Sequence, residues 1–70
     1  MSKDELRSEM IRHKDTNDTL AEYLGISANA LSLKMNGKRD FKLSELQKIK
    51  QRYDLTARDM ARIFFTSKVA

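Results

Sequence analysis

The sequence has no cysteine, no proline and no tryptophan, and its 70 residues include only two glycines and one histidine. Without cysteine the chain cannot form a disulfide, and a single histidine, His13, is a poor basis for a structural metal site. Chains this short often rely on one of those two devices. The core must therefore be held by apolar packing alone, or by packing together with self-association.

The same shortages narrow the classes of function. One histidine, no cysteine and no glycine-rich phosphate loop leave nothing from which to assemble a nucleophile, a base and an orienting group. We therefore expect no enzyme, no cofactor and no metal. The longest uncharged run is far too short for a membrane span, and the charged start does not resemble a signal peptide. We expect a cytoplasmic protein without a membrane partner.

Positive charge is in excess and is unevenly placed. Fourteen Lys and Arg residues against ten Asp and Glu residues give a net charge of +4 at pH 7. Most of the acidic residues lie in the first third of the chain. A basic cluster lies in the middle, interrupted only by Asp40, and consists of Lys34, Lys38, Arg39 and Lys42. Such a cluster is either a solvated loop or an edge that binds phosphate.

Helical spacing of apolar residues and the capping residues predict five short helices, over about residues 2–13, 16–25, 27–37, 43–53 and 56–64. The expected N-terminal caps include Ser2, Thr16, Ser27 and Thr56. Gly25 is expected to end the second segment in the left-handed conformation. The residues expected on the inner face of the fourth segment are Leu43, Leu46, Ile49 and Tyr53. We expect the Tyr53 hydroxyl to lie in water.

The third of these segments contains an alternation that also fits a strand. Leu31, Leu33 and Met35 are separated by single polar residues. No second alternating run exists to pair with such a strand, whereas Ser27 and Gly37 bracket a stretch of helical length. A helix places Leu31 and Met35 inward and turns Leu33 outward, where we expect it to be exposed to solvent.

The spacing around Gly25 is that of a helix-turn-helix. Ala21 is small where two helices must approach closely, Gly25 makes the turn, and Leu31 follows on the second helix. The stretch TLAEYLGISANALSLKMNGK resembles the DNA-binding domains of the phage Cro and repressor family, which are lambda-repressor-like. The resemblance extends from about Leu6 to Phe64. It implies a compact all-α domain of five helices, with the helix-turn-helix formed by the second and third helices and residues 1–70 forming one domain.

This resemblance implies that the third helix enters the major groove of double-stranded operator DNA. The expected base-reading residues are Ala28, Asn29, Ser32 and Leu33. The expected phosphate-binding residues are Asn17, Ser27, Asn36, Lys38 and Arg39. Asn29 is the best candidate reader because an amide can form two hydrogen bonds with adenine.

Several residues depart from the family pattern. Ala28 and Leu33 stand where polar base-reading residues are usual, so few side chains can read bases through hydrogen bonds. Asp15 stands where an apolar residue is usual, and its charge would be unwelcome in a core. Lys34 replaces an inward aliphatic residue. An outward Leu33 could contact thymine methyl groups, grip a protein partner, or pack against a neighbouring subunit.

Two functions follow from these features. The first is a Cro-like or repressor-like transcriptional regulator from a phage or prophage, binding a two-fold operator as a homodimer in a bacterial host cell. The second is an antirepressor or protein-interaction module that binds a regulatory protein. The expected dimer or partner contacts are Phe64, Phe65 and Val69. We expect residues 65–70 either to fray or to form a contact segment.

Overall fold

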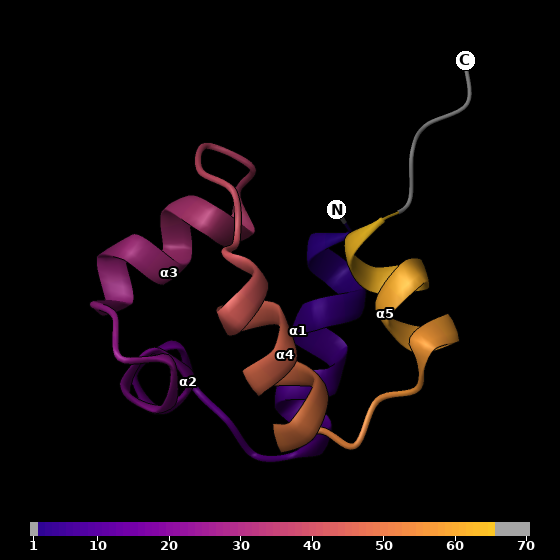
Figure 1. Ribbon diagram of the computed structural model, residues 1–70. Helices are drawn as coiled ribbons and strands as arrows, with labels where there is room; N and C mark the ends of the chain where they lie inside the picture. Colours follow the sequence, from indigo (N-terminus) through magenta and orange to yellow (C-terminus); the bar gives the residue numbers. More distant parts are fainter. Residues whose placement is uncertain (1, 66–70) are drawn as a thin grey trace.

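A computed structural model describes residues 2–65 of the chain, and all the regular secondary structure in this range is helical. The helices are α1 (Lys3–Arg12), α2 (Asn17–Leu24), α3 (Ala28–Met35), α4 (Leu43–Arg52) and α5 (Ala57–Phe64). In Figure 1, α2 and α3 lie on one side of the molecule and α5 on the other, with α1 and α4 between them. The expected compact, all-α fold of five helices is confirmed. In the described part of the chain, no helix is long and apolar enough to span a membrane.

Four of the five helices begin at the expected capping residue. The side-chain oxygens of Ser2, Thr16, Ser27 and Thr56 each accept the backbone N–H three residues ahead, at 3.0–3.3 Å. These bonds satisfy donors that the first helical turn cannot use. α4 differs, because the Glu45 carboxylate instead accepts the backbone N–H of Lys42 at 2.8 Å.

The first four helices end in one recurring turn. After α2, Gly25 is left-handed with φ 76°, its N–H bonds to the carbonyl of Glu22, and the N–H of Ile26 bonds to the carbonyl of Ala21 at 3.0 Å. This is a Schellman motif. The same pair of bonds closes the helices that precede Lys14, Gly37 and Asp54. Lys14 and Asp54 adopt φ 60° and φ 51°, which side chains disfavour.

Each helix supplies one fully buried residue to a shared core. These residues are Leu6, Leu20, Leu31, Ile49 and Ile63. Phe41, in the connection before α4, contacts the Phe64 ring edge-on with 5.5 Å between centroids. One expected core position is wrong, since Leu43 is 71% exposed. Leu43 is the first residue of α4 and lies beyond the end of the stripe that faces the core.

The left-handed turns give a stability test that does not depend on function. Nothing lies within 4 Å of a Cβ added at Gly25, so Gly25→Ala introduces backbone strain alone. We expect it to cost about 1 kcal/mol, and we expect Lys14→Gly to gain up to about 1 kcal/mol. Urea unfolding followed by far-UV circular dichroism measures both. A loss of stability on Lys14→Gly would contradict the turn geometry.

Candidate nucleic-acid interface

The turn between α2 and α3 sets the angle of the two helices. Gly25 reverses the chain, and Ala21 is almost completely buried where the helices meet. Ile26, in the turn, is half-buried and packs against the core. Because Ser27 caps α3 immediately afterwards, the first residues of α3 have a fixed position relative to α2. This arrangement is a helix-turn-helix.

The face of α3 that points away from the core carries the expected readers. Asn29 is exposed, whereas Leu31, Lys34 and Met35 are buried, so the helical phase is confirmed. Leu33 is half-buried, and the expectation that it is solvent-exposed is wrong. The backbone N–H groups of both Lys38 and Arg39 bond to the Leu33 carbonyl, so the turn after α3 closes on the end of the helix.

Two other expected readers lie beside α2 and the core. Ala28 is half-buried and packs against the core cluster. Ser32 is half-buried, and its Oγ accepts a hydrogen bond of 3.3 Å from Nδ2 of Asn17, the first residue of α2. The structure therefore brings together one residue expected to bind phosphate, Asn17, and one expected to read a base.

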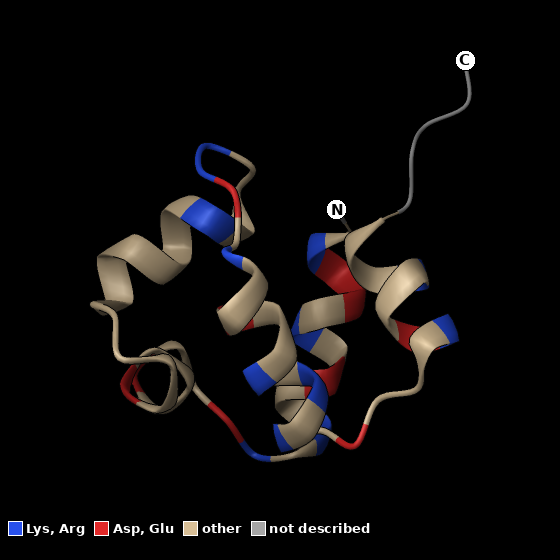
Figure 2. Cartoon of the chain, in the orientation of Figure 1, with Lys and Arg blue, Asp and Glu red and all other residues tan. Residues whose placement is uncertain are grey.

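The turn after α3 presents the expected basic residues to solvent. Asn36, Lys38 and Arg39 are all exposed. The bonds from Lys38 and Arg39 to the Leu33 carbonyl measure 2.9 and 3.3 Å, so the turn is tied to α3. Figure 2 shows its positive charge at the tip of the loop above α3, followed by the single acidic residue Asp40. α3 itself contains no acidic residue.

Lys34 does not belong to this exposed basic cluster. Its Nζ lies 2.5 Å from Oε1 of Glu45, and the two side chains are only 8% and 6% exposed. The pattern of charges left two interpretations open for the cluster that contains Lys34, a solvated loop or a phosphate-binding edge, and the buried Lys34 side chain fits neither. Its ammonium instead holds the C-terminal half of α3 against the start of α4.

The environment of Glu45 favours its carboxylate form. Burial raises the pKa of the Glu45 carboxyl, but hydrogen bonds from the Lys34 ammonium and from the backbone N–H of Lys42 outweigh it. The pKa of Glu45 is therefore lowered below its ordinary value. The same carboxylate oxygen accepts both bonds, which ties α3, the preceding turn and α4 together.

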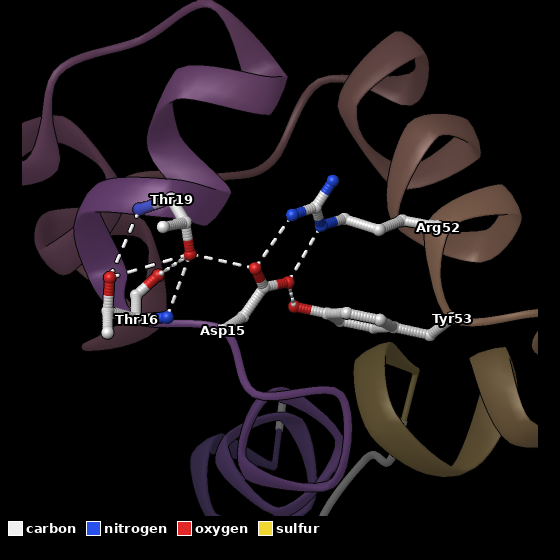
Figure 3. Close-up of polar contacts among 5 residues, drawn as sticks. All are labelled: Asp15, Thr16, Thr19, Arg52 and Tyr53. Carbon is white, nitrogen blue, oxygen red and sulfur yellow. Dashed lines mark hydrogen bonds and ion pairs between the residues drawn. The ribbon is translucent and has the colours of Figure 1, made fainter.

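A second buried carboxylate connects α2 to α4 (Figure 3). Asp15 accepts two bonds of 2.7 Å from the Arg52 guanidinium, one of 2.6 Å from the Tyr53 hydroxyl, and one of 2.7 Å from the Thr19 hydroxyl. Its side chain is 4% exposed. Two expectations are therefore wrong, because the Asp15 charge is fully paired and the Tyr53 hydroxyl does not lie in water.

The pKa values in this network follow from its geometry. The bonds from Arg52 hold the pKa of Asp15 well below its usual range, against the opposing effect of burial. Burial and the bond to Asp15 raise the pKa of Tyr53 above its ordinary value. The Arg52 guanidinium also lies 4.5 Å from the ring centroid of Tyr23 on α2, which adds a cation–π contact between α4 and α2.

The expected contact residues at the end of the chain differ in exposure. Phe64 is half-buried through its contact with Phe41, whereas Phe65 is 62% exposed. Val69 lies outside the described residues. A cavity of about 410 Å³ lies beside Phe65, between the turn after α3 and the end of α5.

The chain matches the BetR domain family over residues 3–65, which includes all five helices. This is a family of helix-turn-helix DNA-binding domains, typically of regulators that are not enzymes. No curated protein and no solved structure matches the chain significantly. The family match covers both the helix-turn-helix and the two buried carboxylate networks.

The Asp15 network predicts a large and pH-dependent effect of Asp15→Asn. We expect a loss of about 2 kcal/mol in unfolding free energy near pH 6, because the variant leaves the half-buried Arg52 and the buried Tyr53 donors without their charged acceptor. Asp18→Asn, on the exposed side of α2, is the matched control and should change stability by less than about 0.5 kcal/mol.

The sign of the pH dependence follows from the lowered pKa of Asp15. Its contribution is present above the ordinary carboxyl pKa of about 4 and is lost as pH falls toward the folded value. The stability gap between the wild-type chain and Asp15→Asn should therefore narrow from pH 6 to pH 2.5 in urea titrations. A gap that widens in acid would show that the carboxylate is not the stabilising form.

The Lys34–Glu45 pair predicts strong coupling between two substitutions. Lys34→Met leaves a buried carboxylate unpaired, and we expect it to cost about 3–5 kcal/mol. Adding Glu45→Gln should restore most of that loss, because the amide oxygen can still accept the Lys42 N–H. A double-mutant cycle in urea measures the coupling. Additive losses would show that the two side chains do not stabilise each other and would contradict the buried pair.

Proposed function

The chain belongs to the BetR domain family of helix-turn-helix DNA-binding transcriptional regulators, and we propose that it is a Cro-like or repressor-like regulator of phage or prophage origin. In this proposal α3 enters the major groove of operator DNA. The observation that carries the proposal is the outer surface of α3. It has no acidic residue, presents Asn29 to solvent, lies beside Asn17 through Ser32, and is followed by the basic turn.

Phosphate contacts fix the position of the recognition helix in this proposal. Asn17, at the start of α2, and Ser27, at the start of α3, lie at helix N-termini where backbone N–H groups favour an anion. On the other side of the groove, the DNA backbone contacts Asn36, Lys38 and Arg39. The exposure of Lys38 and Arg39 supports this role, since neither has to leave a buried partner to reach DNA.

Base recognition relies mainly on one amide. Asn29 can donate to and accept from adenine in the major groove. The Ser32 hydroxyl accepts a bond from Asn17 and keeps its own proton to donate to a base acceptor. The exposed part of Leu33, together with Ala28, can contact thymine methyl groups. With few hydrogen-bonding readers, we expect modest sequence discrimination.

A two-fold operator requires two copies of the chain. We propose a homodimer on DNA in which Phe64, Phe65 and Val69 form the contact, and the large exposed area of Phe65 supports this choice. Identical recognition helices would then lie about 34 Å apart to meet successive major grooves. Residues 1–70 would act as one DNA-binding domain.

One observation favours the alternative of an antirepressor or protein-interaction module. The exposed Phe65 offers an apolar contact to a regulatory protein as readily as to a second copy. Against this alternative, Ala28 and Leu33 are half-buried, so α3 offers a partner less apolar area than the sequence indicated. We therefore favour the DNA-binding regulator.

Selection of bound duplexes from a random pool tests the proposal. We expect an enriched palindrome with half-sites one helical turn apart. On that site Asn29→Ala should cost about 1–3 kcal/mol of binding free energy and relax the preference at one base pair. Gln47→Ala, an exposed amide on α4, is the matched control and should bind normally. No enriched sequence, together with weak binding that does not respond to salt, would support the interaction module instead.

A further inference from the structure

A lysine from the start of the chain lies at the end of the recognition helix. Nζ of Lys3, the first residue of α1, donates a hydrogen bond of 2.7 Å to Oδ1 of Asn36, the residue that ends α3. The two residues are 33 positions apart in the sequence, and both are exposed. Sequence patterns gave no sign that Lys3 lies next to the turn that carries Lys38 and Arg39.

The start of α1 is held firmly in this place. The Ser2 side chain caps α1, and the Ser2 backbone N–H donates to the Ile63 carbonyl of α5 at 2.7 Å. Glu5, two residues along α1, forms an ion pair with Arg62 of α5, which is a second contact between the start of α1 and α5.

The Lys3–Asn36 contact contributes little to folding, because both side chains are exposed and water competes for the bond. Its main consequence is the placement of donors. An ammonium has three N–H donors, of which Asn36 takes one, and the Asn36 amide accepts through Oδ1 while its NH₂ group stays available. Both residues therefore present unused donors at one point on the surface.

We propose that Lys3 and Asn36 together bind one DNA backbone phosphate, as a two-residue site built from α1 and the end of α3. This inference rests on the proposed DNA-binding function and adds a contact that lies outside the helix-turn-helix. Lys3 supplies the charge, and its bond to Oδ1 of Asn36 turns the amide so that its NH₂ group faces the same phosphate oxygen. The phosphate-binding edge then extends from Arg39 to the first turn of α1.

The salt dependence of DNA binding tests this site. Affinity for a 24-base-pair duplex, measured by fluorescence anisotropy between 50 and 200 mM salt, falls with a slope of about −0.9 per phosphate contacted. For Lys3→Ala we expect the slope to be shallower by about 0.9. The loss of affinity across that fourfold salt range should therefore be about 3-fold smaller than in the wild-type chain.

Three companion variants make the test specific. Lys50→Ala removes the same charge from the last turn of α4, about 10 Å along that helix from its first residue, and should leave the slope unchanged. Lys3→Arg keeps the charge and should keep the slope. Lys3→Ala combined with Asn36→Ala should lose less affinity than the sum of the single losses, because both residues serve one phosphate.

The outcomes separate this inference from the function on which it rests. If Lys3→Ala keeps the wild-type slope while Arg39→Ala flattens it, DNA binding stands and the Lys3 site is wrong. If Lys3→Ala and Lys50→Ala change the slope equally, only the net charge matters and the site is again wrong. If the wild-type chain shows no salt-dependent binding, the proposed function itself fails. Far-UV circular dichroism confirms that each variant is folded.

Discussion

The position of the helix-turn-helix depends on one buried carboxylate. Asp15 lies between α1 and α2 and accepts bonds from Thr19 on α2 and from Arg52 and Tyr53 at the end of α4. A buried charge is tolerated only when its lone pairs are satisfied, and here four donors surround it. Since α3 packs on α2, fixing α2 against α4 also fixes α3. The Lys34–Glu45 pair is a second buried ion pair, and it connects the C-terminal half of α3 directly to the start of α4. One ion pair thus holds α3 directly, and the other holds it through α2. The chain has no cysteine with which to form a disulfide or bind a metal.

Local sequence signals accounted for the helices because those signals act over a few residues. Caps at Ser2, Thr16, Ser27 and Thr56, and the glycine turns, depend on bonds that span three to five positions. The interpretation of 27–37 as a helix was correct for the same reason, since its cap and closing glycine outweighed a five-residue alternation. Lys14 and Asp54 show the limit of such reasoning. They take the left-handed turn position that usually calls for glycine, because the same closing hydrogen bonds form around them.

The candidate site was harder to predict, because its contacts join distant residues. Arg52 lies 37 positions from Asp15, Lys34 lies 11 from Glu45, and Lys3 lies 33 from Asn36. From sequence spacing alone, Lys34 is one more cation in a basic cluster. Asp15 is a charged residue at a position where an apolar residue is usual. For Lys34 and Asp15 a usable signal existed, because a charge at a position where an apolar residue is expected requires a partner of opposite sign. The partial burial of Leu33 was not anticipated, because helical phase places its side chain opposite Leu31 but does not show how much of it the rest of the fold covers.

These contacts give the outer face of α3 a fixed and acid-free surface, with Asn17 beside Ser32 and the basic turn after its last residue, which is why we assign it to DNA rather than to a protein partner. The most direct test of that assignment is amide chemical-shift mapping by NMR as the chain is titrated with a selected duplex. We expect the largest shifts at Asn17, along 28–33 and in the turn 36–39, with small shifts over the exposed side of α5. Shifts confined to α5 and Phe65, with α3 unchanged, would contradict the account and place the functional surface at the end of the chain.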